Sequence, residues 1–232
     1  MNNYQFAYGD GTVTLPLEGC NILGELHGNK VEPIKDIRTA LWGSLDEPIG
    51  SEALCKRVKA GNTVALIVSD MSRFWMRQDL VVPHLVDYLT QRCGVQEADI
   101  SIVIANGTHE GGDEQELRTL VTDAVYDRVR VENHDCEATD LVYLGTTPHG
   151  TPVSINRTAA QADIVICLGA VTHHVMAGFG GGRKSILPGI SSRETIFHNH
   201  AFSLDAAQLR SNPAIGNGVL KGNPLHEDMC EA

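Results

Sequence analysis

The 232-residue sequence has little positive charge and no long hydrophobic run. Its 18 Lys and Arg residues are outnumbered by 29 Asp and Glu residues, which gives a formal net charge of −11. Sequence-independent binding to a phosphate backbone requires clustered cations, so this balance argues against a nucleic-acid partner. A stretch of about 20 apolar residues, which a transmembrane helix needs, is absent from the sequence. We therefore expect neither nucleic acid nor a membrane among the partners.

The sequence also lacks the cysteine spacing of a metal site and the start of an export signal. Its 6 cysteines are scattered, without a Cys-x-x-Cys pair. This argues against a disulfide framework and a structural zinc site, and it favours a reducing compartment. The stretch from Met1 to Gln5 has neither the basic nor the apolar region of a secretory signal. These absences together predict a cytoplasmic protein.

Three continuous apolar runs, at 63–68, 100–105 and 163–169, lack the alternation of a half-exposed strand. Such runs are typical of strands that are covered on both faces, as in a parallel sheet. Other strands are expected at 129–131, 141–144 and 152–155, and helices at 33–42, 78–93, 113–125 and 192–204. A hairpin is expected around Gly9, with strands at 4–8 and 12–17. The fold class predicted is α/β, with a largely parallel sheet, helices on both faces and an N-terminal β-hairpin.

Residues capable of catalysis follow each of the three apolar runs. Asp70 and Arg73 follow the first, His109 the second, and His173 and His174 the third. Ligands of parallel sheets bind beyond the carboxyl ends of the strands, so we expect these side chains to meet at one site. A histidine there suits acid–base catalysis near neutral pH, and an arginine suits a substrate carboxylate. The alternative is that they are ordinary polar loop residues and a surface ion pair.

The densest signal is the glycine-rich segment that ends at Ser185. Glycines at 178, 180, 181 and 182 allow backbone N–H groups to approach a ligand, and two cations, Arg183 and Lys184, follow them. The segment nearly matches a P-loop, but Arg183 stands where that motif has its second glycine. One alternative is therefore a phosphate- or nucleotide-binding enzyme that uses residues 178–185. Another is a flexible, solvated surface loop.

No protein-only metal cage is evident from the histidine spacing. The zinc motif His-Glu-x-x-His is absent. On a helix, His198 and His200 would lie roughly 200° apart, so both cannot ligate one metal from one face. The spacing therefore allows one of the two as a ligand and does not choose between them.

Four segments, taken together, resemble the lactate racemase family, whose members are nickel-pincer-dependent 2-hydroxyacid racemases and epimerases. The segments are Ser69–Arg73, Gly107–His109, the stretch from His173 through Gly182-Arg183-Lys184 to Gly189, and Glu194–His200. They occur in the family's order and cover most of the chain between residues 69 and 200. The third segment is long and specific.

This resemblance implies a role for each matching residue. Lys184 resembles the lysine that is covalently attached to the nickel-pincer nucleotide, and His200 resembles the protein ligand of the nickel. His109 and His174 resemble the paired acid–base histidines, and Asp70 and Arg73 resemble the substrate-binding and orienting residues. The remaining cofactor-binding positions would be Gly180, Gly181, Gly182 and Arg183.

The resemblance also implies a reaction: racemisation or epimerisation of a 2-hydroxyacid by proton-coupled hydride transfer to the cofactor's pyridinium ring. The expected partners are a small hydroxyacid and the proteins that mature the cofactor. Ser72 and Phe74 depart from the family pattern and Trp75 adds bulk, which favours a substrate larger than lactate. A ligand-binding module without catalysis is the non-enzymatic alternative.

The family has a second domain that closes over the site, and the chain shows no counterpart of it. Asn223-Pro224 reads as a helix start, with a capping Asn and an early Pro, and no stop signal follows. We therefore expect residues 1–232 to be the N-terminal, cofactor-bearing domain of a longer protein, cut near residue 232, with the C-terminal domain absent.

Overall fold

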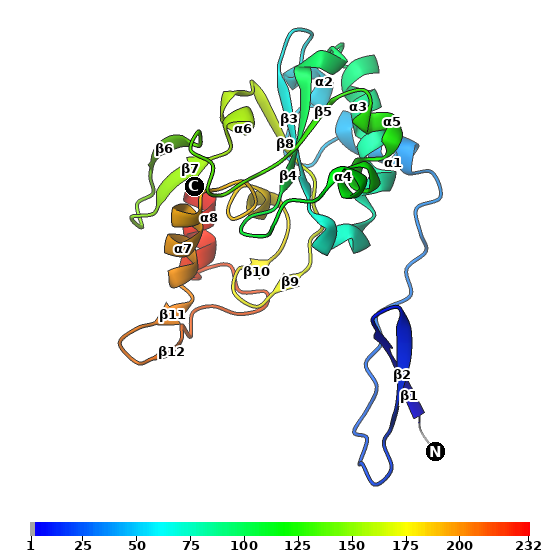
Figure 1. Ribbon diagram of the computed structural model, residues 1–232, viewed down its shortest axis with the longest axis vertical. Helices are drawn as coiled ribbons and strands as arrows, with labels where there is room; N and C mark the ends of the chain where they lie inside the picture. The colour runs from blue at the N-terminus through cyan, green and yellow to red at the C-terminus, as the bar shows by residue number, and fades with distance from the viewer. Residues whose placement is uncertain (1–2) are drawn as a thin grey trace. The chain divides into compact units, whose positions relative to one another are not determined.

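The computed structural model describes residues 3–232, which divide into two compact units, one up to Lys35 and one from Asp36 onward (Figure 1). In the first unit, strands β1 (Asn3–Tyr8) and β2 (Gly11–Pro16) form an antiparallel pair. Gly9 in the turn has φ of 56°, a left-handed conformation that glycine adopts without steric cost. The predicted N-terminal hairpin is confirmed.

The second unit is built on a four-stranded parallel sheet in the order β5 (Arg130–Asn133), β4 (Ile100–Ala105), β3 (Val64–Ser69), β8 (Ile164–Cys167) (Figure 1). From β3 the chain first builds outward through β4 and β5. It then returns to the opposite side of β3 to form β8. In such open sheets, a change of direction marks the place where a crevice forms at the carboxyl ends of the strands.

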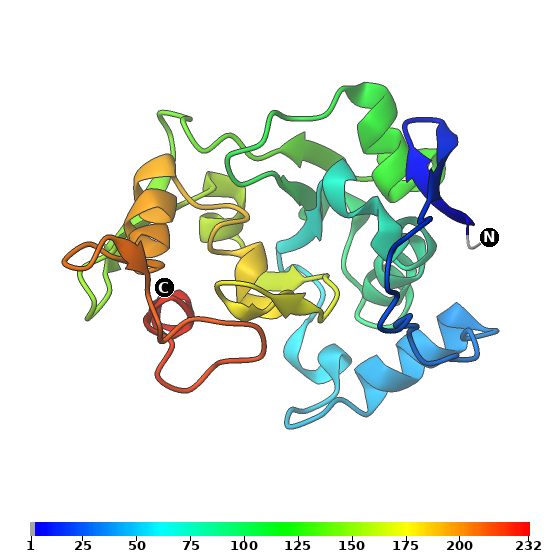
Figure 2. The ribbon, with the colours of Figure 1, turned by 90° about the horizontal axis from the view of Figure 1, so that it is seen from below.

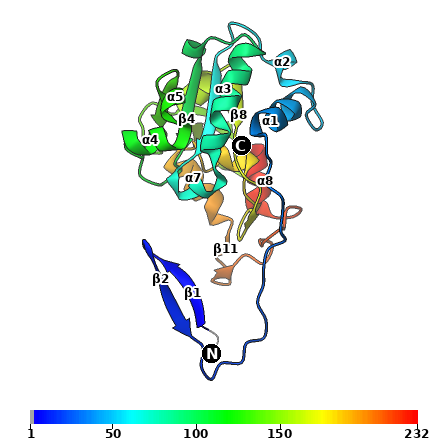
Figure 3. The same ribbon diagram turned by 90° about the vertical axis from the view of Figure 1, so that its right-hand side faces the viewer.

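Both faces of the sheet are covered, as predicted. On one face, alternate residues of β3 and β4 such as Leu66 and Ile102 pack against α3 (Val82–Gln91), α4 (Glu114–Val121) and α5 (Asp123–Tyr126) (Figure 3). On the other face, Ile67 and Val103 pack against β7 (Pro152–Ile155) and α6 (Arg157–Gln161). The absence of polar alternation in these runs follows from this double coverage.

The remaining elements surround the carboxyl edge of the sheet or connect the layers. Helix α7 (Arg193–Ala201) lies beside α8 (Pro224–Glu231) (Figure 2). β6 (Val142–Thr146), where a strand is predicted, pairs antiparallel with β7. The other elements are α1 (Ile37–Asp46), α2 (Leu54–Arg57), β9 (His173–His174), β10 (Gly178–Phe179), β11 (Leu204–Asp205), β12 (Arg210–Ser211) and the 3-10 helices η1 (Met71–Met76), η2 (Gln78–Leu80), η3 (Glu97–Asp99) and η4 (Gly182–Ser185).

Three predicted helices have different limits in the structure. The helix expected at 33–42 begins after Asp36, whose carboxylate caps the N–H of Thr39. The one expected at 113–125 is broken at Thr122, which has φ of 77°. The one expected at 78–93 starts as the 3-10 turn η2, and α3 begins only at Val82. The helix predicted from residue 192 is confirmed at its start, where Ser192 accepts the N–H of Thr195.

The third apolar run was predicted as a strand buried on both faces, and this is wrong. β8 pairs with β3 alone and forms an edge of the sheet. Its residues alternate in burial, and Val165 is 40% exposed. An apolar run of this length therefore identified the strand but not its place in the sheet.

In the described part of the chain, 3–232, no helix combines the length and the hydrophobicity that crossing a bilayer requires.

The core predicts a contrast between two isoleucines. Ile102 is fully buried in β4, so Ile102→Ala should lower the free energy of unfolding by about 2–5 kcal/mol, because a cavity remains. The same substitution at the fully exposed Ile49 should change it by less than about 0.5 kcal/mol. Urea denaturation followed by circular dichroism measures both. Equal losses for the two variants would contradict the assignment of the core.

Candidate functional site

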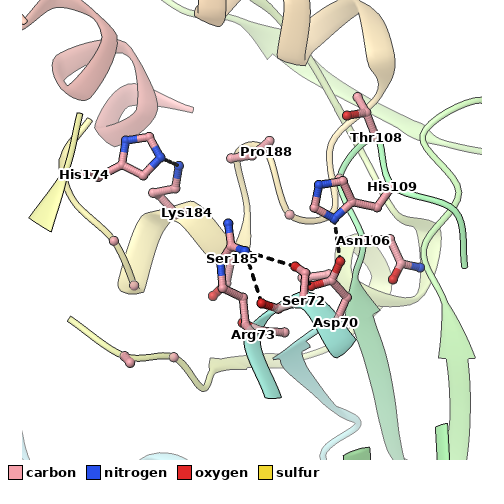
Figure 4. Close-up of a pocket in the computed structure, with 18 of the residues that line it drawn as sticks. Asp70, Ser72, Arg73, Asn106, Thr108, His109, His174, Lys184, Ser185 and Pro188 are labelled. Atoms are coloured by element: carbon pink, nitrogen blue, oxygen red, sulfur yellow. Dashed lines mark hydrogen bonds and ion pairs between the residues drawn. The ribbon is translucent and has the colours of Figure 1, made fainter. Parts of the chain in front are cut away.

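A cavity of about 400 Å³ lies beyond the carboxyl ends of β3 and β4 (Figure 4). It brings together most of the side chains that the sequence singled out from separate segments. Asp70 and Arg73 come from the end of β3, and His109 from the end of β4. From later segments come His174 in β9, Lys184 in η4 and His200 in α7. The convergence of residues after different strands, which the sequence predicts, is present in the structure.

Asp70 orients His109 on one side of the cavity. The Asp70 Oδ2 lies 2.5 Å from His109 Nδ1, and the Ser72 hydroxyl donates to the other carboxylate oxygen at 2.6 Å. A carboxylate facing Nδ1 holds the proton on that nitrogen, which leaves Nε2 as the acceptor of the neutral ring. In Figure 4 the second ring nitrogen faces the open space of the cavity. His109 is therefore arranged as a general base whose tautomer is fixed by Asp70.

His174 and Lys184 form a pair on the other side of the cavity (Figure 4). The Lys184 Nζ lies 3.1 Å from His174 Nε2. His174 Nδ1 accepts the backbone N–H groups of Met176 and Ala177, at 3.2 and 3.1 Å. A neutral imidazole with an accepting Nδ1 carries its proton on Nε2, so in this contact Nε2–H donates and the lysine amine accepts. In this contact, Lys184 is therefore an uncharged amine.

The pKa values agree with a cavity that disfavours cations. Burial, reinforced by the charges of Arg183 and Arg73, lowers the pKa of Lys184 to about 8. Burial, with the nearby charge of Lys184, lowers the pKa of His174 to about 4. The hydrogen bond in which Lys184 accepts thus belongs to the state above about pH 8. Lys184 yields its nucleophilic form much closer to neutrality than an ordinary lysine does.

His200 faces the cavity from α7, and His198 lies on another side of the same helix. Burial and the charge of Lys184 lower the pKa of His200, and a hydrogen bond with the Ile196 backbone opposes this shift. The Nδ1 of His198 instead lies 2.9 Å from the Thr151 hydroxyl. The two imidazoles thus point in different directions, as their spacing predicts, and of the two His200 lines the cavity.

The glycine-rich segment contributes part of the cavity wall. Gly180 and Gly181 line it, and Gly181 has φ of 74°. A Cβ at Gly181 would meet the Ala170 carbonyl oxygen at 2.8 Å, so this position requires glycine.

Two residues predicted to bind the cofactor, Gly182 and Arg183, do not line the cavity. The Arg183 guanidinium turns back to donate to the Ala177 carbonyl at 2.7 Å. The Arg183 side chain therefore stabilises the loop, and its charge acts on Lys184 without direct contact with the cavity. The sequence counted it as a site cation because it cannot show where a side chain points.

Sequence reasoning did not assign roles to several residues that line the cavity: Asn106, Thr108, Thr172, Ser185, Pro188 and Phe197. Asn106 is 2% exposed and donates to the His134 carbonyl at 3.0 Å, which fixes the loop that carries His109. The signal that could have found it is its place directly after the strand. Of the apolar run 74–76, Phe74 packs against the core, whereas Trp75 is 59% exposed and lines the cavity.

Lys184 should lower the stability of the fold. Its pKa falls from 10.5 in the unfolded chain to about 8 in the folded one, so between these values the unfolded chain binds more protons and stability rises with pH. Lys184→Met, which keeps the packing and removes the charge, should stabilise the protein by about 1–3 kcal/mol at pH 7. The gain should shrink as the pH rises from 8 to 10.5.

Urea denaturation of both proteins at pH 7 and pH 10.5 measures this difference, and other titrating groups cancel in the comparison. A variant that is less stable than the parent at both pH values would refute the cost assigned to the buried ammonium group.

Comparison with known proteins places this cavity in a family. Residues 8–211 match the family described as "Lactate racemase N-terminal domain". The lactate racemase of Thermoanaerobacterium thermosaccharolyticum is 30% identical over 237 aligned residues, which cover 100% of this chain and 53% of that protein. The lactate racemase of Lactiplantibacillus plantarum is 31% identical over 97% of this chain and 52% of its own length.

Solved structures agree with this placement. The apoprotein of the Thermoanaerobacterium thermosaccharolyticum lactate racemase superposes with a TM-score of 0.81 at 30% identity, over 99% of this chain and 52% of that one. A Thermotoga maritima protein shares the fold, with a TM-score of 0.60 at 24% identity. The chain spans about half the length of the curated relatives it matches. On the family match and the shared fold, the chain belongs to the lactate racemase N-terminal domain family.

Proposed function

We propose that this chain carries the cofactor and the two proton-transferring histidines of a racemase or epimerase of 2-hydroxyacids. The observation that carries the proposal is the cavity itself. It presents a half-buried lysine amine, a histidine from α7, and two further histidines on opposite sides. The family is one that uses a nickel-pincer nucleotide, and the chain's own residues decide whether such a group fits here.

The residues fit that group. Lys184 has the lowered pKa that forming a covalent bond through its amine requires. His200 lines the cavity and offers an imidazole, a ligand that suits nickel. Across residues 3–232, no group of three or more His, Cys, Asp or Glu side chains could hold a metal. A metal at His200 would therefore draw its other ligands from a bound group, as a pincer nucleotide supplies them.

Arg73 is the residue proposed to bind the substrate carboxylate. Its guanidinium donates to the Ser72 hydroxyl at 3.0 Å, and none of the ion pairs in the described residues involves it. Ser72 in turn donates to Asp70. Arg73 is thus oriented through a hydroxyl without being neutralised, which leaves its fork available for a carboxylate.

His109 and His174 are proposed to handle the hydroxyl proton, one on each side of the substrate. A pincer nucleotide held by Lys184 and His200 would supply a hydride acceptor for the substrate Cα. His109, held by Asp70, receives the hydroxyl proton of one enantiomer through Nε2. For the other enantiomer His174 would take this role in the tautomer that carries its proton on Nδ1, whereas the contacts with Met176, Ala177 and Lys184 favour the Nε2–H form. Inversion needs a proton donor for each face, and the cavity supplies two.

The alternative of a modified P-loop receives no support from the geometry. Residues 182–185 form a short 3-10 turn, whereas a P-loop leads into a long helix whose N-terminus faces the phosphates. Lys184 faces His174, and Arg183 is tied to the loop backbone.

The exposed Trp75 on the cavity wall supports a substrate with more bulk than lactate.

Attachment of the cofactor gives the most direct test. Co-expression with the cofactor-maturation proteins should leave a mass adduct on the peptide that contains Lys184. Lys184→Arg, which keeps a cation but offers no comparable nucleophile, should carry none. Tandem mass spectrometry locates the adduct. Recovery of the unmodified Lys184 peptide from protein exposed to an active pathway would overturn the cofactor assignment.

Asp70 provides a test of the proton-transfer assignment in the loaded protein. Asp70→Asn keeps the size of the side chain but replaces the acceptor of the His109 Nδ1 proton with a neutral amide. Interconversion of hydroxyacid enantiomers should slow by about 10²-fold, the lower end of the range for general acid–base catalysis. Chiral chromatography measures the rate, and the Lys184 adduct should form normally. An unchanged rate would remove His109 from the proposed pair.

A further inference from the structure

We propose that Asp228 is a positioning residue, which holds α7 in the rotation that aims His200 into the cavity. Asp228 lies on α8, is fully buried and does not line the cavity. The part of this proposal that concerns nickel rests on the function proposed above for His200. The part that concerns the position of His200 does not.

The Asp228 carboxylate joins three segments that are distant in the sequence. Its Oδ1 accepts the Thr147 hydroxyl at 2.6 Å. Its Oδ2 accepts the Thr151 hydroxyl at 2.8 Å and the Asn199 side-chain amide at 2.8 Å. Thr147 and Thr151 follow β6 on the way to β7, and Asn199 directly precedes His200 on α7. Oδ2 therefore ties the last turn of α7 to α8 and to the turn between β6 and β7, and Oδ1 ties α8 to that same turn.

The hydrogen bonds of this cluster run in one consistent direction. Because the Thr151 hydroxyl donates to Asp228, it accepts from His198 Nδ1, 2.9 Å away. The Thr147 hydroxyl donates to Asp228 and accepts the backbone N–H of Thr151 at 3.1 Å. Among the described residues, none of the ion pairs involves Asp228. This buried carboxylate depends on neutral donors alone, so the loss of any donor is costly.

The start and the end of α7 are held by different contacts. The Thr195 hydroxyl donates to the Pro152 carbonyl at 2.6 Å, which holds the first turn against β7. Ile196 packs among apolar side chains of α8, contacts that do not fix a rotation. In the last turn, the Asn199 side-chain amide donates both to Asp228 and to the Leu225 carbonyl, at 2.8 and 3.1 Å, so α8 holds this turn through two acceptors. His200 lies in that turn, and of the two acceptors Asp228 is the one that a side-chain substitution can remove.

The test compares the environment of His200 with that of His109, which lies after β4 and outside this cluster. Thr151→Val removes the hydroxyl but keeps the shape of the side chain, and Thr151→Ser keeps the hydroxyl. Asp228→Asn removes one acceptor and turns a donor toward the donors of the cluster. Thr158→Val is the matched control, because it deletes a hydroxyl that donates to Glu132 at 2.7 Å, away from α7.

Diethylpyrocarbonate modification, followed by peptide mass spectrometry, reports each histidine separately. In Thr151→Val and Asp228→Asn the rate at His200 relative to His109 should rise about tenfold, because the last turn of α7 opens more often. Thr151→Ser and Thr158→Val should leave that ratio unchanged. A merely structural role would raise all histidine rates together. An unchanged ratio in both disrupting variants, whether or not both rates rise, would overturn the proposal.

A second readout separates this proposal from the function on which it partly rests. In protein co-expressed with the maturation proteins, the nickel retained per Lys184 adduct should fall in Thr151→Val and persist in Thr151→Ser. Full nickel retention in Thr151→Val would overturn the link to the metal. If no adduct forms in any variant, the proposed cofactor fails, and the His200 modification ratio still decides the positioning role.

Discussion

The parallel register between β3 and β4 is the constraint on which the site depends. Ser69 is paired with Ala105, so the two strands end at the same height and their loops start side by side. Asp70 and Asn106 are the first residues of those loops, and this places the Asp70 carboxylate within reach of His109, only three residues further along. A shift of the register by one residue would reverse the faces of one strand and also separate this pair. The double coverage of the sheet, which holds the register, thus supports the geometry of the candidate site.

Desolvation sets the chemistry of the other half of the cavity. Lys184, His174 and His200 all have pKa values lowered first by burial, and they share the lining with a single acidic residue, Asp70. The chain as a whole carries a formal charge of −11, but this excess lies away from the cavity wall. An anionic substrate would therefore meet a local environment opposite in sign to the whole protein. Burial in this way makes the amine of Lys184 reactive. It also lowers the stability of the fold at pH values at which Lys184 is protonated.

The sequence predicted the parts of this structure that depend on local pattern. The apolar runs located the central strands, and the residues directly after them led to Asp70, His109 and His174. It did not predict that β8 is an edge strand, because burial there depends on which strands are neighbours. It also did not predict that Arg183 turns away from the cavity, because the Ala177 carbonyl that holds it is defined only by the folded loop. In the sequence, Asp228 looks like any acidic residue of a helix. Its hydrogen-bond partners, such as Thr147 and Asn199, are far away in the sequence and meet it only in the folded chain.

The two proposed bases are held by different means, and a racemase does not require them to match. His109 is oriented by a carboxylate, whereas His174 is oriented by two backbone N–H groups and contacts a lysine. Enantiomers have equal free energies in solution, so their equilibrium constant is 1, and the two directions must share one value of kcat/KM however unlike the bases are. If the unlike bases give the two enantiomers different values of kcat, their KM values must therefore differ by the same factor. Inversion at such a site requires one base on each face, whichever partner orients each base.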